Sequence, residues 1–333
     1  MKRFLCLMAA LLFLLPLSGC TAKTEEYTFF AMDTFITLRL PKDAKKEAAE
    51  AERLLLEMEN SLSRTRTSAD VYRVNESTDG IADADGHLLT VLEFSVRMAE
   101  ATGGAFSPAM GSLSDLWNVN GGGPVPSPEA IAEAKRHADY RVFSTDGASV
   151  TKTDRETKLD FGAVGKGYAA QKLTEYLHKH LDWGLVSLGG NVGVFGQKPD
   201  GTPYKIGITN PKDTSAPMGY LLIDGGFVSV SGDYERYFDE NGVRYHHILD
   251  PETGYPADSG LSSAAVWSRD GAKADALSTA LFVMGAQKAL EYYREHPGEF
   301  EAVLITKENK IILTPGLVWG ENFLADDRFR NPQ

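Results

Sequence analysis

Beyond the first twenty positions, hydrophobic residues follow the spacing of strands in some segments and of helices in others. Residues 29–40 are rich in β-branched and aromatic side chains, which predicts a strand. A helix is predicted from Asp43, because apolar residues recur after it at steps of four and three on one face. They are Ala44, Ala48, Ala51, Leu55, Met58 and Leu62. A second helix is predicted over residues 88–101, with an ordered loop over residues 63–86 before it.

The rest of the chain mixes helix signals with tight-turn signals. Ser127-Pro128-Glu129 supplies an N-cap, a first-position proline and a first-turn acid for a third helix. Further helices are predicted over residues 167–180, 272–284 and 287–296, and strands near Ala302 and Ile311. Hairpins are predicted at Asp146-Gly147, Gly225-Gly226 and Asn241-Gly242. Hairpins interspersed with helices predict an α+β fold of mixed, largely antiparallel sheets packed with helices.

The N-terminus has a different pattern. Lys2 and Arg3 precede an apolar run over residues 4–17, which is too short for a transmembrane helix and typical of a secretory signal. The run ends in Leu17-Ser18-Gly19-Cys20, which resembles the lipobox of bacterial lipoproteins. The alternative is an ordinary signal peptide with a chance cysteine. We expect the lipobox, with a diacylglycerol lipid on Cys20.

Three parts of the chain are therefore expected. Residues 1–19 form a lipoprotein signal peptide, residues 20–26 the lipidated cysteine and a polar tether, and residues 27–333 one folded domain. Paired acyl chains, palmitate among them, anchor a protein stably. We expect an exported protein, lipid-anchored to a bacterial membrane and facing the periplasm or the cell exterior.

Cysteine usage and charge narrow the chemistry. The only two cysteines are Cys6, within the signal, and Cys20, consumed by the lipid. No thiol remains for nucleophilic catalysis, so any metal must be held by oxygen or imidazole ligands. The net charge of −12 argues against nucleic acid as a partner, because phosphate binding needs a basic surface.

Two glycine-rich segments are candidate ligand sites. Residues 159–167 predict a strand, a tight turn and a helix start, where free N–H groups and Lys166 would face an anion. The spacing is not that of a Walker loop, and a plain strand–helix connection with a surface lysine is the alternative. Residues 187–193 lack the GxGxxG spacing and the following helix of a dinucleotide fold. We interpret them as a close backbone approach within a sheet.

Two further patterns carry chemistry. A strand delivers His246 and His247 to opposite faces, so only one of them can serve a given site; His246 is the candidate for a structural role. Asp275 and Thr279 lie four apart on one helix face, where both oxygens could reach one Mg²⁺ or Ca²⁺ ion. Alternatively, Asp275 complements the helix dipole and Thr279 bonds back to its own helix.

Together these segments resemble the ApbE family of FAD:protein FMN transferases, from about Met32 to the last helices. The landmarks stand in the family's order. They are residues 31–34, 102–108 with Leu116-Trp117, 159–167, 187–191, 231–236, 247–254 and 275–281.

The resemblance implies a Mg²⁺-dependent enzyme that moves the FMN part of FAD through a phosphoester bond onto a threonine of an acceptor protein, releasing AMP. The acceptors would be threonine-bearing redox subunits. The residues implied to bind FAD are Met32, Ala105, Phe106, Ser107, Asp160, Lys166 and Ile248. The Ala163 carbonyl, Asp275 and Thr279 would hold Mg²⁺, and His247 would be the acid–base residue, with Asp275 also counted as catalytic.

Three positions depart from the family pattern. Asp33 stands where glycine is usual, Val230 where threonine is usual, and Thr65 where an aromatic residue is expected near the flavin. Two other functions would use the same motifs. One is an FAD pyrophosphatase giving FMN and AMP, and the other is a non-catalytic flavin-binding lipoprotein.

Overall fold

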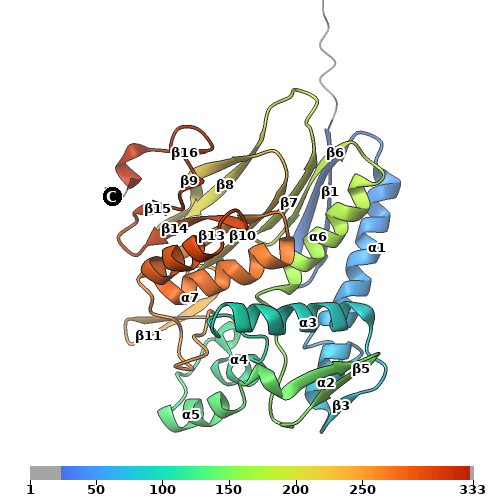
Figure 1. Ribbon diagram of the computed structural model, residues 1–333, viewed down its shortest axis with the longest axis vertical. Helices are drawn as coiled ribbons and strands as arrows, with labels where there is room; N and C mark the ends of the chain where they lie inside the picture. Colours follow the sequence, from blue (N-terminus) through green and yellow to red (C-terminus); the bar gives the residue numbers. More distant parts are fainter. Residues whose placement is uncertain (1–23, 331–333) are drawn as a thin grey trace, which may run out of the picture.

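The computed structural model describes residues 24–330, so the signal peptide and Cys20 predicted from the sequence lie outside the described residues. The centre of the molecule is an eight-stranded sheet in which every pair of neighbours is antiparallel (Figure 1). In spatial order its strands are β1 (Thr24–Ala31), β2 (Thr34–Pro41), β6 (Trp183–Leu188), β7 (Asn191–Gly196), β10 (Gly226–Gly232), β13 (Leu261–Ser268), β14 (Phe300–Thr306) and β15 (Ile311–Leu313).

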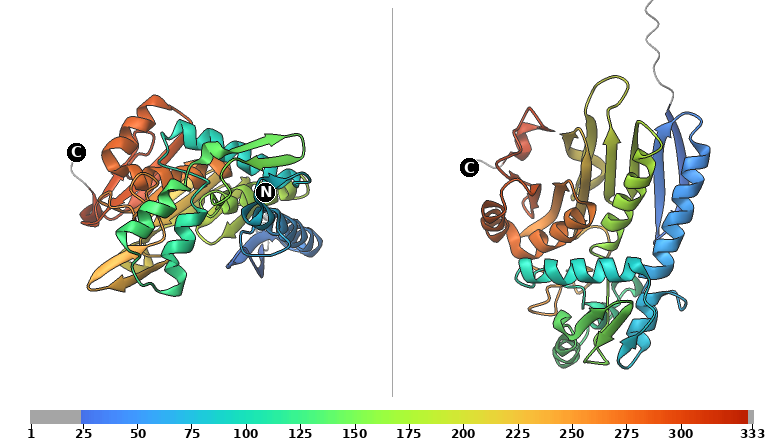
Figure 2. Two further views of the ribbon diagram at one scale, coloured as in Figure 1. Left: turned by 90° about the horizontal axis from the view of Figure 1, so that it is seen from below. Right: turned by 45° about the vertical axis from the view of Figure 1, so that its right-hand side comes forward.

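Each face of this sheet has its own covering layer. Helices α1 (Lys45–Leu62), α6 (Gly165–His178) and α7 (Gly271–Glu295) cover one face and bury the larger apolar core (Figure 2). A three-stranded sheet of β8 (Tyr204–Asn210), β9 (Asp213–Ile223) and β16 (Phe323–Ala325) packs on the other face through a second apolar cluster. Within the eight-stranded sheet, strands β6, β7, β10, β13, β14 and β15 contribute residues to this second cluster, and β1 and β2 contribute none.

Smaller elements gather beyond one end of the helical layer (Figure 1). Helix α3 (Gly86–Ala101) lies across this end, and a three-stranded sheet and several short helices lie beyond it. These are α2 (Asp70–Glu76), β3 (Gly80–Ile81), α4 (Gly111–Trp117), α5 (Pro128–Arg136), β4 (Phe143–Asp146), β5 (Ser149–Lys152) and the hairpin of β11 (Tyr237–Glu240) and β12 (Val243–His246). Within residues 24–330, no helix combines the length and the apolar character needed to cross a membrane.

Several local predictions are confirmed. Helix α5 begins at Pro128, and the Ser127 Oγ accepts a hydrogen bond from the Ala130 N–H at 3.2 Å. The turn Asn241-Gly242 joins β11 to β12, with φ of 52° and 77° at the two residues. Gly285 (φ 76°, ψ 169°) interrupts α7, so its two halves correspond to the two helices predicted there.

Three predictions are wrong. Residues 29–40 are not one strand, because Met32 and Asp33 turn the chain with φ of 50° and 57° between β1 and β2. Gly225-Gly226 does not close a hairpin, since β9 and β10 belong to different sheets. The predicted loop over residues 63–86 contains α2 and β3. The turn at Met32-Asp33 was not predicted because no glycine or proline marks it. Helix α2 was not predicted because its seven residues are too few to show a clear helical periodicity. Also, β1 already begins at Thr24, within the expected tether.

Helices α6 and α7 cross at two glycines. A Cβ added to Gly167 would overlap the backbone oxygen of Gly271, and one added to Gly271 would lie 2.5 Å from the oxygen of Gly167. Glycine lets the two backbones approach to this distance. The Gly167 N–H then donates a hydrogen bond to Asp275 Oδ2 at 2.8 Å. The crossing therefore fixes the start of α6 against the first turns of α7.

We expect Gly167→Ala to lower the free energy of unfolding by about 1–3 kcal/mol, because the added methyl group forces the two helices apart. Urea denaturation measures this change. Gly86→Ala is the matched control, since Gly86 also opens a helix and its Cβ would meet nothing within 4 Å. Equal losses in the two variants would contradict the proposed role of the crossing.

Candidate functional site

Asp275 is a carboxylate buried at the α6–α7 crossing. Its side chain is 4% exposed, and the Gly167 N–H is a neutral donor. Burial raises the pKa of Asp275, whereas the charge of Lys166 and hydrogen bonds from Gly167 and Asn191 lower it. Burying a carboxylate is costly unless a cation or several donors compensate it. Asp275 is therefore placed to interact with a positively charged partner.

Three hydroxyl groups lie together where α7 meets β10. Ser231 Oγ on β10 lies 2.9 Å from Ser278 Oγ and 3.0 Å from Thr279 Oγ1. Ser278 Oγ also donates to the Asp275 backbone oxygen at 2.8 Å. Since residues four apart share a helix face, Asp275 and Thr279 present a carboxylate and a hydroxyl side by side. This shared face is the arrangement assumed in the predicted pairing of the two residues as metal ligands, which stays a prediction.

Lys166 contributes the positive charge of the site. It is the second residue of α6, and its charge lowers the pKa of both Asp275 and Glu235. Much of Glu235 is exposed, yet burial of its carboxyl group is the largest effect on its pKa and raises it. Glu235 Oε1 would lie 3.5 Å from a Cβ on Gly190, so the carboxyl group lies over the turn between β6 and β7.

His247 directly follows β12 and lies near the positive charges of Lys166 and Arg236. Its Nδ1 lies 3.3 Å from the Arg236 carbonyl oxygen, which can only accept, so Nδ1 carries the proton and Nε2 keeps a free lone pair. Burial, then the charges of Arg236 and Lys166, lower the pKa of His247 to about 4. His247 is therefore neutral near pH 7 and can act as a base.

His246 has a different role. It is 7% exposed, its Nε2 donates to the Ala257 oxygen at 3.1 Å, and its ring meets Phe282 edge to face. These contacts agree with the structural role predicted for it.

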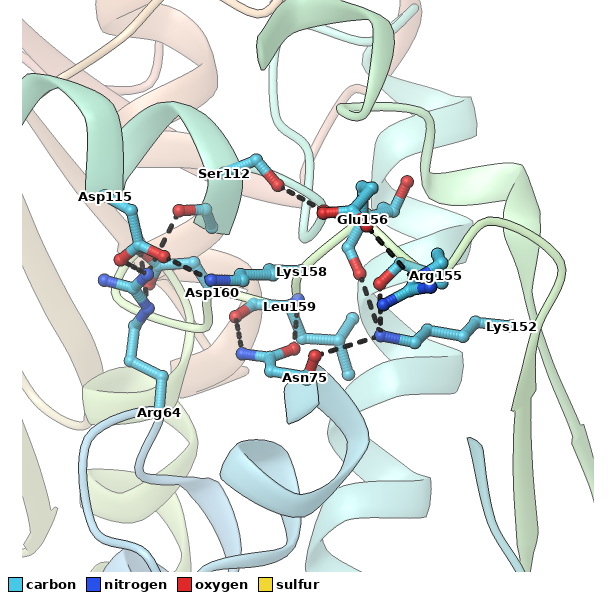
Figure 3. A network of polar contacts seen from close by, with 12 residues as sticks. Arg64, Asn75, Ser112, Asp115, Lys152, Arg155, Glu156, Lys158, Leu159 and Asp160 are labelled. Carbon is cyan, nitrogen blue, oxygen red and sulfur yellow. Dashed lines mark hydrogen bonds and ion pairs between the residues drawn. The ribbon is translucent and has the colours of Figure 1, made fainter. Parts of the chain in front are cut away.

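Asp160 lies at the start of the glycine turn before α6 (Figure 3). Its Oδ1 accepts the Gly162 N–H at 2.9 Å, and its Oδ2 lies 3.7 Å from Arg64 Nε. Arg64 also donates to the Gly111 oxygen at 3.0 Å and pairs with Asp115. The carboxylate is thus held from both sides at one orientation.

Asn75 fixes the segment that leads to Asp160. Its amide donates to the Leu159 oxygen at 2.9 Å and accepts the Leu159 N–H at 2.7 Å, as a neighbouring strand would (Figure 3). Lys152 Nζ in turn donates to the backbone oxygen of Asn75 at 3.1 Å and to the backbone oxygen of Arg155 at 3.0 Å. Burial lowers the pKa of Lys152, and backbone oxygens supply its bonds.

A cavity of about 680 Å³, partly lined by residues of α7, has the size of a small-molecule site. Its walls include Ala105, Ser107, Asp250, Val283, Met284 and Tyr292. Lys166, Asp275, Thr279 and His247 do not line it. Val283 nevertheless lies one turn beyond Thr279 on the same face of α7. The cavity and the polar cluster of Asp275, Ser278 and Thr279 are therefore neighbours along one helix.

The other predicted site residues are placed as follows. Ala105 and Ser107 border the cavity, whereas Phe106 and Ile248 are 2% and 4% exposed and belong to the apolar core. Met32 lies at the tip of the β1–β2 hairpin, and its N–H donates to Glu59 Oε1 at 2.9 Å. Ala163 lies two residues before α6.

The structure accounts for two departures from the family pattern. Asp33 has a φ of 57°, a left-handed conformation in which glycine is the least strained residue and aspartate is tolerated. Val230 packs against the second apolar cluster, on the face of β10 opposite Ser231. Nothing in the contacts of Thr65 explains its presence in place of an aromatic residue.

Sequence reasoning missed four residues of the cluster, Ser231, Ser278, Asn191 and Glu235. Each lies inside a segment already singled out, but their meeting depends on contacts among β7, β10 and α7. Ser278 had the clearest signal, since it stands between Asp275 and Thr279.

The donor set fits Mg²⁺. Residues 24–330 contain no cluster of three or more histidine, cysteine or acidic side chains suited to a metal. Mg²⁺ commonly takes only one or two carboxylates and completes its shell with water and substrate phosphates. The buried Asp275, the Thr279 hydroxyl and the Ala163 carbonyl, two residues before α6, are hard oxygen donors of this kind.

Sequence and fold are those of a known class. The sequence matches the ApbE family over residues 32–304, so the chain belongs to that family. It is 33% identical over 326 residues to the FAD:protein FMN transferase of Treponema pallidum, covering 90% of each chain. It is 31% identical to that of Klebsiella pneumoniae, covering 88% of this chain and 92% of that one. The chain is therefore an enzyme of this family.

Solved structures agree with this assignment. The ApbE protein of Thermotoga maritima matches with a TM-score of 0.82 and 31% identity, over 88% of this chain and 98% of that one. The Pseudomonas stutzeri flavinyl transferase ApbE matches with a TM-score of 0.78 and 29% identity, over 88% and 95%. The α+β fold and the family resemblance predicted from the sequence are both confirmed.

We expect Asn75→Ala to lower the free energy of unfolding by about 2–5 kcal/mol, because it leaves two buried backbone groups of Leu159 without partners. Thermal and urea unfolding measure the loss. Asn120→Ala, at an exposed asparagine, serves as the control and should change little. If Asn75→Ala unfolded like the wild type, Asn75 would not be what holds this segment.

Proposed function

We propose that the enzyme transfers the FMN part of FAD onto a threonine hydroxyl of an acceptor protein and releases AMP, in a reaction that requires Mg²⁺. The observation that carries the proposal is the buried Asp275 with Thr279 and Lys166, one helical turn from a cavity of about 680 Å³. The names of the relatives support the same activity.

In this proposal the pyrophosphate of FAD lies at the start of α6. Lys166 and the free N–H groups there attract its oxygens. Asp275, Thr279 and the Ala163 carbonyl would hold Mg²⁺, which when bound polarises the phosphates and offsets negative charge. The remaining residues expected to bind FAD are Met32, Ala105, Phe106, Ser107, Asp160 and Ile248.

The acceptor threonine supplies the nucleophile. Its Oγ attacks the FMN phosphorus, while His247 Nε2 takes the hydroxyl proton. The new P–O bond joins FMN to threonine, and the bond to the bridging oxygen breaks, so that AMP leaves with the electron pair. Lys166 then stabilises the charge that builds up on AMP.

The experiment is mass spectrometry of a threonine-bearing redox-subunit domain incubated with the detergent-solubilised full chain, FAD and Mg²⁺. We expect an adduct of FMN mass on threonine together with AMP, and neither after EDTA treatment. An unmodified domain with free FMN and AMP would instead indicate an FAD pyrophosphatase. Intact FAD would indicate a flavin-binding protein without this activity.

His247→Ala should lower the transfer rate by about 10²–10⁴-fold, the usual contribution of a general base, and leave FAD affinity nearly unchanged. Because the pKa of His247 is about 4, its neutral form persists as the pH falls through 6.5. The wild-type rate should therefore keep this contribution down to about pH 5 and lose it near pH 4. His180→Ala, at an exposed histidine, is the control. An acid limb centred near 6.5 would contradict this assignment.

We further propose that a lipid on Cys20 anchors the enzyme outside the cytoplasm, near redox subunits that receive flavin. The Cys20→Ala variant, expressed in a bacterium, should move from the membrane fraction to the soluble fraction and retain its transfer rate. Fractionation by ultracentrifugation and the adduct assay measure both. Membrane retention of Cys20→Ala chains from which residues 1–19 have been removed would rule out the lipid as the anchor.

A further inference from the structure

Two phenylalanines at the tip of the β1–β2 hairpin are open to solvent. Phe30 and Phe35 are 61% and 71% exposed, the highest values among the exposed large hydrophobic residues of the described chain. They are direct cross-strand partners, with ring centroids 5.4 Å apart in an edge-to-face arrangement. The β8–β9–β16 layer does not reach this part of the sheet. Exposed aromatic pairs of this kind are typical of protein interaction sites.

A hydrogen bond ties the hairpin tip to α1. The two-residue turn at Met32 and Asp33 is tied to α1, because the Met32 N–H donates to Glu59 Oε1 at 2.9 Å. Glu59 is itself buried, and its Oε2 pairs with Arg66 at 2.7 Å. A surface that is already fixed loses little conformational entropy when a partner binds.

The hairpin tip lies at the end of the sheet next to the candidate site. Thr34, next to Phe35, packs so closely on the turn after β6 that a Cβ on Gly189 would lie 2.5 Å from its Oγ1. The next residue, Gly190, faces the carboxyl group of Glu235, whose pKa responds to Lys166. Thr34 thus connects the hairpin tip to the turn beneath Glu235, whereas Phe30 and Phe35 lie on the face of the sheet opposite Ile36 and the helical layer.

We propose that Phe30 and Phe35 form the docking surface for the folded acceptor protein that brings its threonine to the site. The inference rests on the proposed function, which requires a polypeptide to reach the charged centre. A folded acceptor that reaches the site also covers this end of the sheet, where the two exposed aromatic rings provide apolar anchors for it.

The position of the hairpin favours an acceptor protein over the membrane. The pair lies six residues along β1 from Thr24, roughly 20 Å at 3.3 Å per residue. The chain enters the sheet at the Thr24 end, and the aromatic pair lies at the opposite end of the strand (Figure 1). A lipid on Cys20 would therefore attach at the end of β1 remote from the pair.

The test compares the wild type with the double variant Phe30→Thr/Phe35→Thr in the full chain. Threonine keeps the strand propensity of these exposed positions. The matched control is Leu56→Gln, an exposed hydrophobic residue on α1. FMN transfer is measured to a redox-subunit domain and to a short peptide that contains the same threonine, with FAD affinity measured separately.

We expect the double variant to raise KM for the domain by about tenfold, with kcat, transfer to the peptide and FAD affinity unchanged. The Leu56→Gln control should behave as the wild type. An unchanged KM for the domain would overturn the docking surface while leaving the proposed function intact. No transfer by the wild type would overturn both. Loss of binding to phosphatidylethanolamine–phosphatidylglycerol vesicles with an unchanged KM would assign the pair to the membrane instead.

Discussion

The candidate site depends on one close contact, the crossing of α6 and α7 at Gly167 and Gly271. The two backbones approach until an added Cβ on Gly271 would lie 2.5 Å from the Gly167 oxygen. This approach lets the Gly167 N–H donate to Asp275 at 2.8 Å and brings Lys166 near the same carboxylate. A sequence whose glycines permit the contact thus builds an anion-attracting helix start and a cation-attracting carboxylate in one place.

The electrostatics of the site follow from this arrangement. Burial raises the pKa of Asp275 and Glu235, and Lys166 opposes the rise in both. The same positive charge, together with burial and Arg236, lowers the pKa of His247 to about 4. A neutral imidazole near Lys166, together with a buried carboxylate that the same lysine partly offsets, suits a reaction in which a proton leaves a hydroxyl group and phosphate charge is neutralised.

Much of this could be predicted from the sequence, but not all. Asn241-Gly242 identified its hairpin because both residues tolerate positive φ, and Asp275 with Thr279 identified a shared helix face. Met32-Asp33 gave no such signal, so two strands were predicted as one. The two hydrogen bonds between the Asn75 side chain and the Leu159 backbone join residues 84 positions apart, and local sequence patterns carry no information about such a contact. The same holds for Ser231, Asn191 and Glu235.

The central claim is that Asp275 and Thr279 hold the metal beside the pyrophosphate at the start of α6. A crystal structure of the full chain with FAD and Mn²⁺ in place of Mg²⁺ tests it most directly, since anomalous scattering locates the metal. We predict an Mn²⁺ ion directly coordinated by the Asp275 carboxylate and the Thr279 hydroxyl, with a pyrophosphate oxygen in its shell. A metal and pyrophosphate bound elsewhere, with Asp275 still bonded only to its protein neighbours, would contradict the account.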